Sequence, residues 1–280
     1  MKYLTGFWRD DKTQGPVRLT LILLGLTGAG LILVVPLVFI FVQALSAGLA
    51  GLWKNLTDAE MLHALWLTVG IALITVPVNV VFGVMLAWAV TRFSFPGKNL
   101  LLTLSGIPFA VSPVVAGLAA LLFYGANGPL AGILDKAQVQ ILFAWPGMVL
   151  VTIFVTAPFV ARELIPVMTS RGSAEEEAAM ILGATGREIL WRVTLPNILP
   201  GLLYGVLLTN ARAIGEFGAV SVVSGSIRGE TMTLPLQIEL LEQDYNTAGA
   251  FTAAAVLTLL ALITLAFKRL IEKRRAADRM

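Results

Sequence analysis

The chain has 280 residues, of which 57% are hydrophobic and only 13% are charged. A soluble domain of this length cannot hide so much apolar surface, so the composition predicts that lipid is the solvent for much of the chain. The absence of cysteine excludes disulfides, thiolate metal sites and cysteine nucleophiles, and one histidine is too few for a histidine metal site. The net charge of +3 could indicate nucleic-acid binding, but in so apolar a chain we interpret the basic residues as topology signals.

Six apolar stretches are long enough to cross a membrane as helices, which takes about 20 residues. They predict an all-α membrane protein with an N-terminal segment over residues 1–18, a transmembrane domain over 19–267 and a basic tail over 268–280. The predicted spans are 19–45, 65–90, 100–124, 141–161, 198–223 and 248–267. The first apolar run is longer than the core of a signal peptide, so it is expected to be an uncleaved anchor.

Lysine and arginine fall mainly on one side of these spans. With the N-terminus inside, sixteen of the 20 basic residues lie in cytoplasmic segments, three lie outside, and the remaining one, Arg212, lies within a span. Because positive charge is retained in the cytoplasm, both termini of this multi-pass protein are predicted to be cytoplasmic.

Two local features of the spans bear on how the helices pack. Pro108 and Pro113 fall in the third predicted span, either as ordinary membrane-helix prolines or as a bend in a helix that lines a pathway. Gly201 and Gly205 have the spacing of small residues that lets two helices approach closely.

The loop between the fourth and fifth spans, residues 162–197, contains two helix starts, both within the coupling loop expected over 170–197. Ser173 with Glu176, and Thr185 with Glu188, have the spacing of capping boxes, and Pro196 is expected to end the second helix. The resulting hairpin is expected to expose small and apolar side chains, namely Ala178, Ala179, Leu182, Ile189 and Leu190. Such a face suits either the groove of another protein or lipid headgroups, and periodicity leaves both open.

This loop resembles the EAA signature of binding-protein-dependent ABC importer permeases. The matching residues are Glu177, Ala178, Ala179, Gly183, Val193, Leu195 and Pro196, with valine where isoleucine is commoner in the family. The resemblance implies the MetI-like permease fold, with this hairpin as a coupling helix docked in a cleft of an ATPase. Gly183 is expected to lie in a tight turn that leaves little room for a Cβ. The chain has no phosphate-binding P-loop, so ATP and Mg²⁺ are expected on the ATPase and no cofactor is expected in this chain.

Arg212 and Glu216 lie four residues apart in the fifth predicted span, on one helical face. Ionisable groups in hydrocarbon cost at least about 2.5–3.5 kcal/mol each, so the pair is expected to face the bundle interior or water. They either line an anion pathway or form a structural ion pair. Ser221, Ser224 and Arg228 follow as further pathway candidates, or as parts of a solvated loop. The stretch 232–241 is apolar enough to return into the bundle.

This region, together with Ile107–Gly117 and Glu242–Asn246, resembles the sulfate and molybdate permeases, and the likeness covers nearly all of the chain from about 45 to 260. The resemblance implies a non-catalytic subunit of the bacterial inner membrane that imports sulfate or thiosulfate, with molybdate or tungstate as the alternative. The implied partners are two copies of a CysA-like ATPase, a second CysT-like permease and a periplasmic sulfate- or thiosulfate-binding protein. A secondary anion transporter would explain the spans and the charged pair but has no use for the EAA loop. A membrane enzyme would need a cluster of catalytic groups that the sequence lacks.

Overall fold

The structure is a computed structural model that describes residues 14–277, with side chains described for 18–267. The described part is helical and contains no strand. Its first half comprises α1 (Gln14–Ala29), η1 (Gly30–Val34), α2 (Val35–Ala44), α3 (Gly48–Leu56), α4 (Ala59–Arg92), α5 (Lys98–Ala110), α6 (Pro113–Tyr124) and α7 (Ala131–Ala137). Its second half comprises α8 (Trp145–Arg171), α9 (Ala174–Ile181), α10 (Gly186–Ile189), η2 (Leu190–Thr194), α11 (Leu195–Ile214), α12 (Gly218–Ser224), α13 (Leu234–Gln243) and α14 (Thr247–Ala277). The segment 1–13 and the last tail residues, 278–280, lie outside the described residues.

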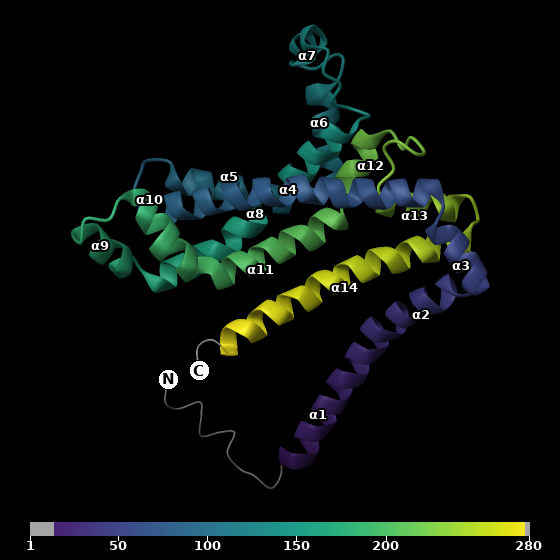
Figure 1. The fold of residues 1–280 in the computed structure, drawn as a ribbon, viewed down its shortest axis with the longest axis horizontal. Coiled ribbons are helices and arrows are strands. Elements are labelled where there is room, and N and C mark those ends of the chain that lie inside the picture. Colours follow the sequence, from purple (N-terminus) through teal and green to yellow (C-terminus); the bar gives the residue numbers. More distant parts are fainter. Residues whose placement is uncertain (1–13, 278–280) are drawn as a thin grey trace.

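Helices α4, α8 and α11 lie side by side at the centre of the bundle (Figure 1). Val160 of α8 is fully buried between a glycine on each neighbour. A Cβ on Gly83 of α4 would lie 2.5 Å from the Val160 Cβ, and one on Gly205 of α11 would lie 3.1 Å from its Cα. A Cβ on Gly201 would lie 3.0 Å from Val167 Cγ2. The close packing predicted from Gly201 and Gly205 is therefore confirmed, and it brings α11 against α8.

Five helical runs are long and apolar enough to cross a membrane: Arg18–Ala44, Ala59–Arg92, Trp145–Arg171, Gly186–Ile214 and Thr247–Phe267. The third predicted span consists of two helices, α5 and α6, with a bend of 107° between them, so it is either one broken span, which gives six spans in all, or a re-entrant loop. Ser112, which precedes Pro113, has φ −58° and ψ 137°, the extended conformation that residues before proline prefer. Pro108 lies inside α5, so the break occurs at Pro113.

Pro196 does not end a helix, contrary to expectation. Helix α10 continues through the π-helical segment η2 into α11, and the run is interrupted only after Ile214. Proline lacks a backbone N–H, and the wider π-helical turn lets the chain pass it without stopping. The same arrangement occurs in the first run, where η1 directly precedes the Val35-Pro36 step. The helix that contains the fifth predicted span, 198–223, therefore begins before residue 198. It is broken between Ile214 and Gly218.

The segment after α12 returns into the bundle, as its apolar composition predicts. Residues 231–237 are all buried, and the N–H of Leu234 donates to Thr68 Oγ1 of α4 at 2.7 Å. Thr68 also donates to the Ala64 carbonyl, so its hydroxyl joins the turn before α13 to α4. Helix α13 then packs on α14.

Two parts project from the central helices in Figure 1. Helices α6 and α7 form an arm that extends away from α4 and α8, and α1 diverges from the rest of the chain. In the most apolar part of the first run, Arg18–Ala44, no residue is buried. Helix α2 contacts α14, where the rings of Phe39 and Phe251 meet edge to face at 5.7 Å.

Candidate functional site

A tight turn between α9 and α10 closes the hairpin at one end of the bundle (Figure 1). The N–H of Gly183 donates to the Met180 carbonyl and that of Ala184 donates to the Ala179 carbonyl, both at 3.0 Å. These two bonds make a Schellman motif, which needs a left-handed residue just past the helix end. Gly183 has φ +89°. The expected crowding is absent, because nothing lies within 4 Å of a Cβ built there, so backbone conformation is the reason for glycine.

One of the two predicted capping boxes forms. Thr185 Oγ1 accepts from the Glu188 N–H at 3.4 Å, and the Thr185 N–H donates to Glu188 Oε2 at 2.9 Å. Ser173 makes no such box, since its hydroxyl donates to Glu177 Oε1 at 2.5 Å. Glu176 does not reach back to Ser173, because its carboxylate binds Arg92 at the end of α4.

The hairpin exposes an apolar tip formed by three consecutive residues. Met180, Ile181 and Leu182 are 65%, 86% and 87% exposed. The expected exposed face was partly wrong, because Ile189 is buried and Leu190 is half-buried. The tip lies at the C-terminal end of α9, where the Schellman turn holds it out from the bundle.

The signature residues have different environments within this hairpin. Glu177 and Ala178 are exposed, whereas Ala179 is half-buried and supplies a carbonyl to the turn. In the run from η2 into α11, Val193 and Leu195 are half-buried and Pro196 is exposed. The signature therefore builds the turn and the start of α11, and the tip that it presents is apolar.

The predicted ion pair in the membrane is present, but not within one helix. Arg212 lies in the last turn of α11, and Glu216 lies in the break before α12. Arg212 Nη1 is 2.5 Å from Glu216 Oε2, and Glu216 Oε1 accepts from the Ala219 N–H at 2.9 Å. Glu216 therefore ties the end of α11 to the start of α12.

The three other pathway candidates have local partners. Ser221 donates to the Gly218 carbonyl at 3.0 Å, and the fully buried Ser224 accepts from the Ser226 N–H at 3.1 Å. Arg228 pairs with Asp244 at 2.5 Å, with both side chains about half exposed. The structure does not join these residues to the Arg212 pair through any hydrogen bond or ion pair among the described residues.

The structure adds Arg162 to the candidates, although the sequence placed it in a loop. Arg162 lies within α8, is exposed, and has its Cζ 4.8 Å from the centre of the Phe109 ring in α5. Phe109 also packs on Phe159, with ring centres 4.9 Å apart. Among the described carboxylates none pairs with this guanidinium. The spacing of Phe159 and Arg162 was visible in the sequence, but the contact with Phe109 was not.

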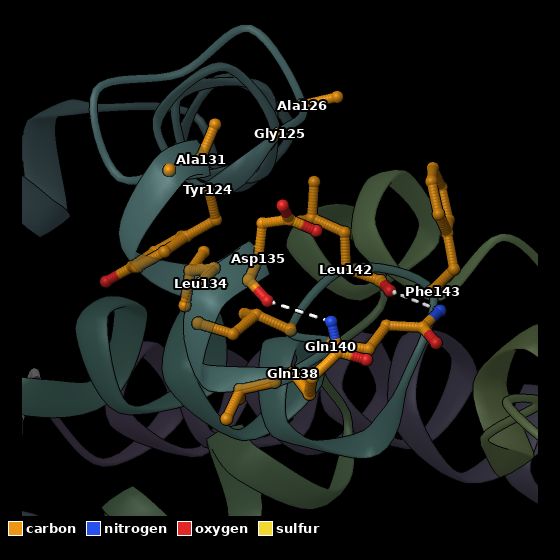
Figure 2. Close-up of a pocket in the computed structure, with 13 residues that line it drawn as sticks. Tyr124, Gly125, Ala126, Ala131, Leu134, Asp135, Gln138, Gln140, Leu142 and Phe143 are labelled. Atoms are coloured by element: carbon orange, nitrogen blue, oxygen red, sulfur yellow. Dashed lines mark hydrogen bonds between the residues drawn. The ribbon is translucent and has the colours of Figure 1, made fainter.

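A separate hollow of about 710 Å³ lies on the α6–α7 arm (Figure 2). Its amide side chains are used within the arm, since Gln138 Nε2 donates to the Asp135 carbonyl at 2.9 Å and Gln140 Nε2 to the Leu142 carbonyl at 3.2 Å. Farther along, the N–H of Phe143 donates to the Val223 carbonyl of α12 at 2.8 Å. The hollow is thus part of the turn that carries the chain back from the arm to the bundle.

The helical bundle, with the α9–α10 hairpin at one end of it, is that of a multi-pass membrane protein. The chain belongs to the family of binding-protein-dependent transport system inner membrane components, whose model matches residues 79–277. It is 69% identical to the sulfate transport system permease protein CysW of Escherichia coli strain K12 over 91% of this chain and 87% of that protein. It is 52% identical to CysW of Synechococcus elongatus, over 95% and 92% of the two chains. It is 39% identical to the sulfate transport system permease protein CysT of the same organism, over 84% of each.

Solved structures with the same fold are ABC importers. A bacterial ABC transporter that imports the acidic polysaccharide alginate matches with a TM-score of 0.79, covering 96% of this chain and 98% of that chain at 18% identity. The same kind of transporter in complex with an alginate-bound periplasmic protein matches with a TM-score of 0.76, over 95% and 97% of the chains, again at 18% identity. At this identity the likeness establishes the fold, which is that of an ABC importer permease.

Proposed function

We propose that this chain is the permease subunit of an ABC importer that carries sulfate, and thiosulfate with it, into the cytoplasm. The observation that carries the proposal is the high identity to CysW proteins over almost the whole chain, combined with the family membership. The chain contributes the membrane pathway and performs no chemistry itself, and ATP with Mg²⁺ is bound and hydrolysed by a partner.

The α9–α10 hairpin is the surface through which that partner acts. Its tip, Met180 to Leu182, exposes three large apolar side chains next to the acidic first turn of α9. A short helix with an apolar face suits a groove in another protein. In this proposal the groove belongs to the ATPase, present in two copies, and Gly183 fixes the angle at which the tip enters it.

The remaining partners follow from the same likeness. A CysT-like chain supplies the second half of the pathway, as its resemblance to this chain supports. A periplasmic binding protein delivers the anion, as the solved alginate importer with its bound periplasmic protein illustrates. In this proposal the hairpin and both termini lie in the cytoplasm, which the distribution of basic residues supports.

Arg212 and Arg162 are the residues that we assign to the pathway. Arg212 remains 31% exposed although its partner is buried, and Arg162 has an aromatic ring beside it but no ion pair with any carboxylate in residues 18–267. A cation in hydrocarbon is costly, so both guanidinium groups are expected to face water or the second permease. Ser221, Ser224 and Arg228 are less suited, because each is engaged by its own neighbours.

The alternative oxyanions, molybdate and tungstate, are less favoured because two relatives that are 69% and 52% identical to this chain are sulfate permeases. A secondary transporter is less favoured because it would not need the hairpin. The decisive experiment is ATP-driven uptake of labelled sulfate by vesicles that contain this chain, the second permease and the ATPase, with the binding protein added. Uptake of molybdate in preference to sulfate would contradict the proposed substrate, and uptake without the ATPase would contradict the proposed mechanism.

A further inference from the structure

Arg92, the last residue of α4, forms a two-pronged ion pair with Glu176 in the first turn of α9. Its Nε is 2.6 Å from Glu176 Oε2, and its Nη2 donates to Oε1 at 3.2 Å. Both side chains are only 13% exposed. Paired hydrogen bonds between guanidinium and carboxylate fix direction as well as distance, and lysine cannot reproduce that geometry.

The remaining donors of Arg92 hold the end of α8. Nη1 donates to the Met168 carbonyl at 3.2 Å, and Nη2 donates to the Gly172 carbonyl at 2.8 Å. The last carbonyls of a helix have no partner within the helix, and a cation there also complements the helix dipole. One guanidinium therefore joins the ends of α4 and α8 to α9.

The Glu176 carboxylate has a second partner besides Arg92. The hydroxyl of Thr194, a buried residue of η2, donates to Glu176 Oε1 at 2.8 Å. Because η2 continues into α11, the carboxylate connects α9 to α4 and α11, and Arg92 extends the connection to the end of α8. We call Arg92, Glu176 and Thr194 the polar junction.

Apolar packing contributes little to the position of α9. None of its residues is buried, and its main contacts are with its chain neighbours α10 and η2. Apolar contacts also allow sliding, since they have no preferred direction, whereas charge-assisted hydrogen bonds do. The first turn of α9 is also bonded to α11, because Asn197 Nδ2 donates to Glu175 Oε2. Among the described contacts, the Arg92–Glu176 pair is the one that joins this turn directly to α4.

We infer that Arg92 is a positioning residue for energy coupling: through the polar junction it transmits movement of the hairpin to α4 and α8. The inference rests on the proposed role of the hairpin as the ATPase docking surface. Without the junction, the hairpin would still enter the ATPase and would stay joined to α11 through α10 and η2, but the first turn of α9 would lose its link to α4. Such a complex would hydrolyse more ATP for each anion that it moves.

The test compares ATP hydrolysed with sulfate taken up in vesicles that hold the complete complex. Arg92→Gln removes the ion pair with Glu176, and Arg92→Lys keeps the positive charge without the paired hydrogen bonds. Thr194→Val removes one hydrogen bond to Glu176 without leaving a charge unpaired. Lys98→Gln is the matched control, because it removes a basic residue near the same end of α4, and no ion pair involves Lys98 among the residues whose side chains the structure describes. Amounts of assembled complex are equalised by co-purification with the ATPase.

We expect Arg92→Gln to raise the ATP hydrolysed per sulfate ion roughly tenfold, within the range of coupling free energies between sites. Arg92→Lys and Thr194→Val should give smaller increases, and Lys98→Gln none. An unchanged ratio in Arg92→Gln and Thr194→Val, with uptake falling only as assembly falls, would show a purely structural role. If the unaltered complex takes up no sulfate at all, the proposed function fails instead.

A second measurement does not depend on transport. Because the chain has no cysteine, spin labels placed by Met85→Cys on α4 and Met180→Cys on α9 report the distance between these helices alone. The inference predicts one narrow distance distribution, which Arg92→Gln broadens and Lys98→Gln leaves unchanged. Equal widths in all three proteins would overturn it.

Discussion

Arg212 and Glu216 form an ion pair in which only one partner reaches the surface of the chain: the side chain of Arg212 is 31% exposed and that of Glu216 is 1% exposed. Glu216 is also bound by the backbone of α12, through the Ala219 N–H. The carboxylate therefore has a structural role at the α11–α12 break. The guanidinium has donors left over, which makes it the member of the pair that is suited to contact an anion.

This asymmetry predicts different outcomes for single and double substitutions. Arg212→Met leaves a buried carboxylate uncompensated, which costs on the order of 3–5 kcal/mol and should impair assembly. Adding Glu216→Gln removes the charge and keeps an oxygen for the Ala219 N–H, so assembly should recover. We expect sulfate uptake to stay low, because the anion contact is gone. Full uptake by the double variant would remove both residues from the pathway.

The hairpin turn predicts that Gly183→Val is harmful and Gly183→Asn is tolerated. The φ of +89° is strained by about 1–3 kcal/mol for most residues, but asparagine adopts positive φ more readily. Open space around the position means that size alone should not matter. Both variants should insert in the membrane, and uptake per assembled complex should fall for valine only. An equal loss of uptake in Gly183→Val and Gly183→Asn would contradict the conformational explanation and indicate that the ATPase leaves no room for a side chain at this position.

The apolar tip predicts a site-specific effect of a charge. Ile181→Glu should reduce co-purification of the ATPase by about tenfold, because it places a carboxylate in an apolar groove. Ile133→Glu is the matched control: this residue of α7 is 65% exposed but lies on the arm (Figure 1). Equal loss of the ATPase in both variants would mean that the tip is not the docking surface.

The proposed orientation predicts opposite labelling of two introduced cysteines. Ser173→Cys in the hairpin should react with a membrane-impermeant thiol reagent only after the cells are opened. Asp135→Cys on α7 should react when only the outer barrier is permeabilised. The chain has no cysteine of its own, so it gives no background. Labelling at position 173 in closed cells would reverse the proposed topology.

The bond between Thr68 and Leu234 predicts a loss of stability. Thr68→Val keeps the shape but leaves the buried N–H of Leu234 without an acceptor, which costs about 1–3 kcal/mol. The midpoint of thermal unfolding in detergent should fall. Thr103→Val is the control, because this exposed threonine bonds only within its own helix. A similar shift in both proteins would argue against the buried bond.

The features predicted correctly from the sequence depend on residues close together in the chain. The apolar runs indicated helices in lipid, the Thr185 and Glu188 spacing produced a capping box, and the spacing of Arg212 and Glu216 produced an ion pair. The capping box and the ion pair each join residues within about one helical turn, where local backbone geometry decides which groups can meet. The resemblance of the loop to a family signature added the expected hairpin.

Tertiary structure decided which partner a group takes when two compete. Glu176 is near enough to Ser173 for a capping box, yet it binds Arg92, 84 residues away in the chain. Likewise, the π-helical turn before Pro196 keeps a helix intact that a proline was expected to end. The physical reason is that membrane helices are apolar on every side, so their sequence does not reveal which faces pack together. Only the packing of α4 against α8 brings the Arg92 guanidinium to the first turn of α9, where its charge outcompetes a local hydroxyl.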